Sequence, residues 1–223
     1  MMDGRHQHHG IGMTSQRTRD RMVTRLEELG IRDPRVLAVM RATPRHLFVE
    51  EALASRAYED TALPIGYGQT ISQPYIVARM TELVLQAGRP QKVLEVGTGS
   101  GYQAAVLAQV VPVVYTVERI AALADRARRL LLEVGFSNIR FRVSDGSWGW
   151  KEDAPFDAIV LTAAPDEIPE GLLEQLTPDG RLIGPVGAEG AQQLMVVRRE
   201  NRSYVRQVVE PVSFVPLRRG LEA

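Results

Sequence analysis

The apolar residues of the chain fall into two alternating patterns, short β-branched runs and longer segments with helical spacing. The short runs cover residues 93–96, 113–117, 139–143 and 156–162. A helical pattern follows the first run over residues 104–108 and the second over residues 121–134. Strands that alternate with helices along a chain pair in parallel. The pattern therefore predicts an α/β domain built on a mostly parallel, doubly wound sheet.

Three helical segments precede the first of these strands. Apolar residues at helical spacing begin near Ser15 and end at Gly30. Asp33 and Pro34 then start a second helix as its N-cap and its first helical residue. A third, short helix is expected over residues 47–57. We expect the whole segment 14–57 to form a helical cap over the sheet.

The last part of the chain has strand patterns with little helix between them. After a short helical segment at residues 172–176, a fifth strand is expected over residues 181–185. Two further runs, 193–199 and 204–214, flank a polar turn, which is typical of a β-hairpin. An antiparallel hairpin would close the parallel sheet. With 223 residues in all, the length suits one domain, which we expect to span residues 14–223.

Regular periodicity disappears between residues 58 and 74. Prolines and glycines crowd this segment, including Pro64, Gly66 and Gly68. A connection of this length inside a compact domain tends to carry function, and a variable surface excursion is the plain alternative. We expect a loop here that binds substrate and cofactor, followed by a helix over residues 74–87.

Composition and charge narrow the classes of partner. The chain has 27 basic and 27 acidic residues, so its net charge of zero does not favour nucleic acid or membranes. It has no cysteine, which excludes disulfides and suits a reducing compartment. No apolar run reaches about 18 residues, and no secretory signal is present. We expect a cytoplasmic monomer whose His-rich residues 1–13 form a disordered leader and not a metal site.

The turn after the first predicted strand carries the clearest chemical signal. Three glycines stand at alternate positions from Gly97 to Gly101. Glycines allow positive φ and let a ligand approach main-chain N–H groups at a helix start. The dinucleotide fingerprint G-x-G-x-x-G would need glycine where the chain has Tyr102. The G-x-G-x-G pattern, preceded by Glu95, resembles the first motif of the Rossmann-like class I S-adenosylmethionine-dependent methyltransferases.

An acidic residue lies at the carboxyl end of each of the next two predicted strands. Ligands of open α/β sheets bind beyond the carboxyl ends of the strands. Glu118 ends the second predicted strand, where a carboxylate can accept hydrogen bonds from both ribose hydroxyls. Asp145, with Gly146 after it, lies at the end of the third and is placed to meet the adenine amino group. A plain Asp-Gly turn is the alternative for Asp145.

Several separate blocks of the sequence resemble one family, the protein-L-isoaspartate O-methyltransferases. The blocks are residues 43–45, 63–74, 93–102, 118, 145–146, 156–164 and 211–217. They run through nearly everything after residue 15. The glycine motif is shared by many methyltransferases and indicates only the cofactor. The run Gly-Gln-Thr-Ile-Ser-Gln-Pro at residues 68–74 is far more specific.

The resemblance implies transfer of a methyl group from S-adenosyl-L-methionine to the free α-carboxylate of L-isoaspartyl residues in damaged proteins and peptides. It implies that Ser72 is the catalytic residue. With the turn and strand ends described above, it implies cofactor contacts at Thr70, Gln73, Glu95, Gly97, Thr98, Gly99, Gly101, Tyr102, Glu118, Asp145, Gly146 and Thr162. It implies substrate contacts at Ile65, Gly66, Thr70, Ser72, Val215, Pro216 and Leu217. The His-rich leader has no counterpart in the family pattern.

This chemistry needs little from a base. A backbone α-carboxylate, whose ordinary pKa is about 3.3–3.7, is already ionised at neutral pH. Methyl transfer to it depends on positioning and on removal of water from the nucleophile. We expect Ser72 to orient one carboxylate oxygen as a hydrogen-bond donor. Capping of the helix that starts at Pro74 is the structural alternative, and both roles are compatible.

Two other functions stay open on the sequence alone. A methyltransferase of the same fold acting on a small molecule is favoured if the segment 58–74 has no part in peptide binding. An inactive cofactor-binding regulatory module would predict a broken turn at residues 97–101 or loss of Glu118, and neither is seen.

Overall fold

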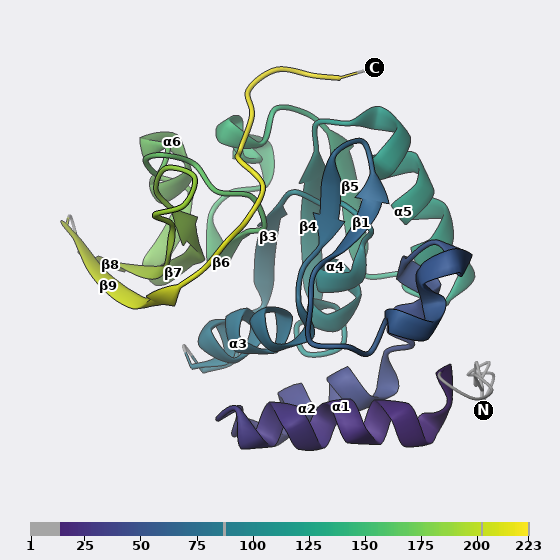
Figure 1. Ribbon diagram of the computed structural model, residues 1–223. Helices are drawn as coiled ribbons and strands as arrows, with labels where there is room; N and C mark the ends of the chain where they lie inside the picture. Colours follow the sequence, from purple (N-terminus) through teal and green to yellow (C-terminus); the bar gives the residue numbers. More distant parts are fainter. Residues whose placement is uncertain (1–13, 87, 202, 223) are drawn as a thin grey trace, which may run out of the picture.

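A seven-stranded sheet runs through the centre of the molecule (Figure 1). The computed structural model describes residues 14–86, 88–201 and 203–222, so the predicted leader at residues 1–13 lies outside the described residues. The strands are β3 (Lys92–Val96), β4 (Val113–Glu118), β5 (Ile139–Val143), β6 (Phe156–Leu161), β7 (Leu176–Val186), β8 (Gln193–Glu200) and β9 (Ser203–Pro211). Their order across the sheet is β5-β4-β3-β6-β7-β8-β9.

The strand order creates a crevice at the end of β3. Strands β3 to β7 pair in parallel with one another. The hairpin of β8 and β9 is added antiparallel to β7. The chain passes from β3 outward through β4 to β5 and then returns to β6 on the other side of β3. Such a reversal of strand order opens the ligand crevice of α/β sheets. The predicted Rossmann-like fold is confirmed.

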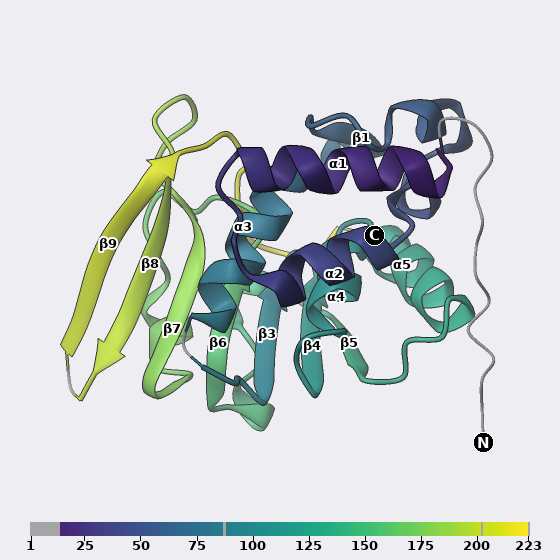
Figure 2. The ribbon, with the colours of Figure 1, turned by 90° about the horizontal axis from the view of Figure 1, so that it is seen from below.

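Helices cover both faces of the sheet unequally. The helices are α1 (Gln16–Glu28), α2 (Pro34–Ala42), α3 (Pro74–Leu85), α4 (Tyr102–Leu107), α5 (Ala121–Glu133) and α6 (Glu170–Leu173). Figure 2 shows α1 to α5 on one face. The other face packs against α6 and the segment before it. Successive strand residues point to opposite faces, so Val93 joins the first core and Leu94 the second. No helix within the described ranges is long and apolar enough to cross a membrane.

The two N-terminal helices have nearly the predicted bounds and pack on α3. Asp33 caps α2 as the sequence predicts, because its side chain accepts a hydrogen bond from the Arg35 N–H at 2.9 Å. The Glu82 carboxylate of α3 accepts from the N–H groups of Arg32 at 2.7 Å and Asp33 at 3.0 Å. These bonds join the start of α2 to α3, the helix that begins just after Ser72.

The predicted third helix over residues 47–57 is wrong. Two short 3-10 helices, Arg45–Phe48 and Glu51–Arg56, take its place. No residue of the second is buried, so an α-helix here would lack the apolar stripe that holds a helix against a core. The Nε atom of the buried Arg45 donates to the Ala57 carbonyl at 2.8 Å and ties the two ends of the segment together.

The segment at residues 58–74 is not the irregular loop that the sequence predicted. It contains an antiparallel hairpin of β1 (Leu63–Gly66) and β2 (Gln69–Ile71). Leu63, Ile65 and Ile71 are buried on one face, a strand alternation that the intervening prolines and glycines obscure. The turn residues Tyr67 and Gly68 both have positive φ, of 53° and 64°, as a type I′ hairpin turn requires.

Strand β7 is longer than predicted. It begins at Leu176, which pairs with Phe156, and a register shift separates this pair from the pair of Ala158 with Arg181. Residues 178–180, which lie between the predicted helix and the predicted fifth strand, are therefore an irregularity inside the strand. The helix before it, α6, ends at Leu173, and β9 ends at Pro211, before the predicted end at residue 214.

Candidate functional site

The glycine turn connects β3 to α4 at the crevice. The N–H groups of Gly97 and Thr98 both donate to the Val117 carbonyl, at 2.8 and 3.2 Å. Gly97, Gly99 and Gly101 have φ values of 102°, 53° and 86°. A Cβ atom on Gly97 would lie 2.3 Å from Thr162 Oγ1. Both the backbone conformation and the close approach of β6 therefore demand glycine at position 97.

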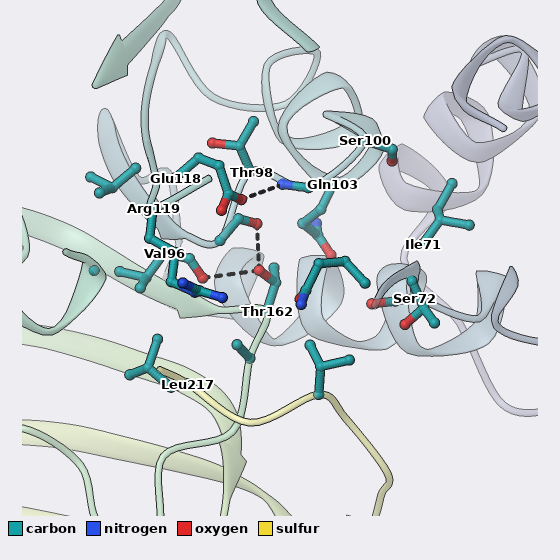
Figure 3. A pocket seen from close by; sticks show the side chains of 18 of the residues that line it. Ile71, Ser72, Val96, Thr98, Ser100, Gln103, Glu118, Arg119, Thr162 and Leu217 are labelled. Carbon is teal, nitrogen blue, oxygen red and sulfur yellow. Dashed lines mark hydrogen bonds between the residues drawn. The ribbon is translucent and has the colours of Figure 1, made fainter. Parts of the chain in front are cut away.

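Glu118 links the glycine turn to the end of β4. Its Oε2 atom accepts from the Gly99 N–H at 2.9 Å (Figure 3). Its Oε1 atom accepts from the Ile120 N–H at 3.0 Å. The residue is only 6% exposed. A carboxylate has about four lone-pair sites, so both oxygens can still accept from a ligand. Glu118 is thus fixed by the main chain and open toward the crevice.

A pocket enclosing about 720 Å³, part of it open to solvent, lies beside these groups. It brings together segments that are far apart in the sequence: the hairpin strand β2, the glycine turn, the ends of β4 and β6, and a C-terminal stretch. The predicted site residues on its wall are Thr70, Ser72, Gly97, Thr98, Gly99, Tyr102, Glu118, Gly146, Thr162, Val215, Pro216 and Leu217. No three His, Asp or Glu side chains gather as metal ligands within the described part of the chain.

The C-terminal stretch crosses the carboxyl ends of the strands (yellow in Figure 1). The Ala164 N–H donates to Val215 O at 2.8 Å, and the Leu217 N–H donates to Ala164 O at 2.7 Å. Further along, Glu222 forms an ion pair of 2.6 Å with Arg119, next to Glu118. Residues 215–218 therefore form one wall of the pocket.

Six predicted site residues lie outside the pocket wall, and four of them lie in the hairpin, pack behind the glycine turn or bind Asp60. Ile65 supports the turn from behind, since its Cδ1 atom would be 3.4 Å from a Cβ on Gly99. The neighbouring Gly66 is in the hairpin strand β1. Gly101 packs against α5, where a Cβ would lie 2.8 Å from Leu131 Cδ1. The Gln73 amide turns away and donates to Asp60 Oδ2 at 2.8 Å.

Asp145 is the fifth, and its carboxylate is bound by its own chain. Oδ1 accepts from the Ser147 N–H at 2.9 Å and from the Ser147 hydroxyl at 2.7 Å, while Oδ2 accepts from the Gly220 N–H at 2.7 Å. Burial raises the pKa of Asp145, but the hydrogen bonds from Gly220 and Ser147 outweigh it and lower the pKa. Asp145 braces the C-terminal stretch, and its contact with adenine stays a prediction.

Glu95 is the sixth and lies one layer behind the turn. The Thr116 hydroxyl donates to its Oε2 atom, and Thr116 in turn is 2.6 Å from the hydroxyl of Thr98, which lines the pocket. Its Oε1 atom is buried without a hydrogen-bond partner among the described residues. Burial, with a smaller contribution from the charge of Glu118, raises the pKa of Glu95 to about 8.

Ser72 lines the pocket, and its hydroxyl has no hydrogen-bond partner among the described residues. Gln73, not Ser72, occupies the N-cap position of α3, and the helix receives its side-chain cap from Asp60, whose Oδ1 atom accepts from the Tyr75 N–H at 2.9 Å. The capping alternative for Ser72 is therefore wrong. Its hydroxyl makes no hydrogen bond with any residue that the structure describes, so it is available to a ligand in the pocket.

Comparison with known proteins identifies the family. The model of the protein-L-isoaspartate(D-aspartate) O-methyltransferase family matches residues 17–222. The chain belongs to this family. It is 61% identical to the protein-L-isoaspartate O-methyltransferase of Halorhodospira halophila over 95% of the chain and 96% of that protein. It is 57% identical to that of Alcanivorax borkumensis over the same shares of both chains.

Solved structures agree with this assignment. A protein-L-isoaspartate O-methyltransferase structure, 29% identical, superposes with a TM-score of 0.81 and covers 89% of this chain and 65% of that one. The Plasmodium falciparum protein of the same description, solved with S-adenosyl-L-homocysteine, shares the fold at 24% identity, with a TM-score of 0.78 over 90% of this chain and 98% of that one. The chain is a protein repair methyltransferase that uses S-adenosyl-L-methionine and acts on isoaspartyl residues.

Some wall residues of this methyltransferase were not predicted from the sequence. They are Gln69, Ile71, Val77, Val96, Ser100, Gln103, Val117, Arg119, Ala163 and Arg218. Several adjoin predicted residues, so their position along the chain was a usable signal. Val77 had no such signal, because it lies within α3 and only the packing of that helix turns it to the pocket.

We predict that Glu95→Gln changes the pH dependence of stability. The carboxyl of the unfolded chain ionises near its ordinary pKa of 4.5, whereas the folded one stays protonated up to about pH 8. Ionisation therefore favours the unfolded state across that window, and wild type should lose stability relative to Glu95→Gln as the pH rises through it. Denaturant unfolding at a series of pH values measures the difference. Parallel profiles for the two proteins would contradict a buried, protonated Glu95.

Proposed function

We propose that Ser72 and the neighbouring pocket wall hold the isoaspartyl α-carboxylate, while the glycine turn and Glu118 hold the cofactor. The observation that carries this proposal is the unengaged Ser72 hydroxyl in the same pocket as the Glu118 carboxylate. Figure 3 shows the two side chains on opposite sides of the pocket, with Thr162 between them. An elongated cofactor with its ribose at Glu118 would extend toward Ser72.

The residues at the turn fit S-adenosyl-L-methionine. Gly97 and Gly99 line the pocket without a side chain, and the Glu118 oxygens can accept from ribose hydroxyls. Thr162 braces this arrangement, since its hydroxyl donates to Val96 O at 2.9 Å and also to Gly97 O. When bound, the cofactor supplies an electrophilic methyl group on a positively charged sulfur.

The protein contributes alignment and exclusion of water. The α-carboxylate is ionised at neutral pH, so no residue has to remove a proton from it. Ser72 donates a hydrogen bond to one carboxylate oxygen and leaves the other free to accept the methyl group. The wall formed by residues 215–218 reduces contact with water. Alignment of reacting groups can supply roughly 7–11 kcal/mol of the barrier reduction.

We further propose that the enzyme works as a cytoplasmic monomer, without nucleic acid or membrane. The formal net charge of zero supports the part of this proposal that concerns nucleic acid and membranes, because it favours neither polyanions nor anionic lipid surfaces.

We predict that Ser72→Ala lowers kcat while the melting temperature and the affinity for S-adenosyl-L-homocysteine stay nearly unchanged. The reason is that the hydroxyl makes no bond within the described fold, so its removal affects only the bound carboxylate. Steady-state kinetics with an isoaspartyl peptide, thermal unfolding and calorimetry give the three readouts. A variant with full kcat would remove Ser72 from the catalytic step.

We predict that methylation is confined to the isoaspartyl peptide of a matched pair. The isoaspartyl linkage leaves the α-carboxylate on a short stem, whereas a normal aspartyl carboxylate is one methylene further out. A misplacement of about 1 Å can lower the rate about 10²-fold. Transfer of labelled methyl groups to both peptides measures the ratio. Equal labelling of the aspartyl control, or labelling of neither peptide, contradicts the proposed binding mode.

A further inference from the structure

Asp60 connects the chain before the hairpin to the chain after it. Its Oδ2 atom accepts from the Gln73 side-chain amide at 2.8 Å, and its Oδ1 atom accepts from the Tyr75 N–H at 2.9 Å. The two bonds reach both sides of Pro74, the first residue of α3. One carboxylate therefore fixes the segment that directly follows Ser72.

The position of Ser72 depends on its two neighbours. Ile71, before it, is 3% exposed and pairs with Leu63 in the hairpin ladder. Gln73, after it, is held by Asp60. Because the Ser72 hydroxyl has no hydrogen bond to any described residue, the backbone on either side is what fixes the position of its Cβ atom in the pocket wall. The hairpin ladder fixes one side, and Asp60 fixes the other.

A carboxylate is well suited to this position. The first N–H groups of a helix lack partners within the helix and carry partial positive charge. Hydrogen bonds to a charged acceptor are about twice as strong as neutral ones. The Arg45 guanidinium, 0% exposed, interacts electrostatically with Asp60, and both of its Nη atoms lack hydrogen bonds to described residues. Burial lowers the pKa of Arg45 to about 10, so it is still a cation at neutral pH.

We propose that Asp60 is a positioning residue for methyl transfer, which acts through Gln73 and the first turn of α3 to hold Ser72 against the substrate carboxylate. This inference rests on the proposed role of Ser72. It also gives Gln73 a different role from the predicted cofactor contact, since its amide faces Asp60 and not the pocket. An ordinary helix cap would contribute stability alone.

The test compares Asp60→Ala with Asp33→Ala. Asp33 is a matched control, because its carboxylate caps α2 through the Arg35 N–H at 2.9 Å and does not line the pocket. Kinetics with an isoaspartyl peptide at saturating S-adenosyl-L-methionine, melting temperature and affinity for S-adenosyl-L-homocysteine are measured for each. We expect both variants to have a lower melting temperature. Only Asp60→Ala should also have a lower kcat, by about tenfold or more, because a small misplacement of the reacting groups lowers the rate strongly.

Two further variants separate positioning from general damage. Gln73→Ala breaks the same connection and leaves the cap on Tyr75 intact, so it should lower kcat with little change in melting temperature. Asp60→Asn keeps an acceptor for the Tyr75 N–H and can re-pair with the Gln73 amide, so it should recover part of the lost kcat. Both remain informative if Asp60→Ala does not fold.

The outcomes distinguish this inference from the proposed function. Full kcat in Asp60→Ala and Gln73→Ala, with Ser72→Ala impaired, overturns the positioning role alone. Equal kcat losses in Asp60→Ala and Asp33→Ala also overturn it, because they indicate a general effect of lost stability. Full kcat in Ser72→Ala instead overturns the proposed role of Ser72, on which the inference rests.

Discussion

The hydrogen bond between the Gly99 N–H and the Glu118 carboxylate is the interaction on which the site depends. It joins the turn after β3 to the last residue of β4 at 2.9 Å. The turn can reach that position only because its glycines take positive φ, and Thr162 of the β6 end closes on it from the other side. Three neighbouring strand ends thereby become one rigid platform at the point where the strand order reverses.

Two segments from outside the parallel sheet complete the pocket on this platform. The hairpin of β1 and β2 brings Thr70 and Ser72 to one side, and Ile65 of the same hairpin packs against the turn at Gly99. The C-terminal stretch crosses from β9 to the end of β4 and is held by Asp145 and Arg119. The sheet thus provides the platform, and the two added segments complete the pocket in which we propose that the isoaspartyl carboxylate binds.

Much of this architecture could be predicted from the sequence, and the failures have physical causes. Strands β3 to β6 were predicted to within one residue, because buried parallel strands read as short apolar runs. The β1–β2 hairpin was not predicted, because Pro64 and Gly66 interrupt the alternation of buried and exposed positions in the sequence. The structure shows that alternation, with Leu63 and Ile65 buried. Which way a polar side chain points was not predictable. Asp60 had no signal at all, because its partners Gln73 and Tyr75 lie 13 and 15 residues away.

Calorimetric titration of Glu118→Ala with S-adenosyl-L-homocysteine tests the central claim most directly. Loss of a charged hydrogen-bond partner lowers binding free energy by about 1.5–3 kcal/mol, which is more than tenfold in Kd. The account predicts a loss of this size in a variant that remains folded by thermal unfolding. An unchanged Kd in the folded variant would contradict the claim that Glu118 and the glycine turn hold the cofactor.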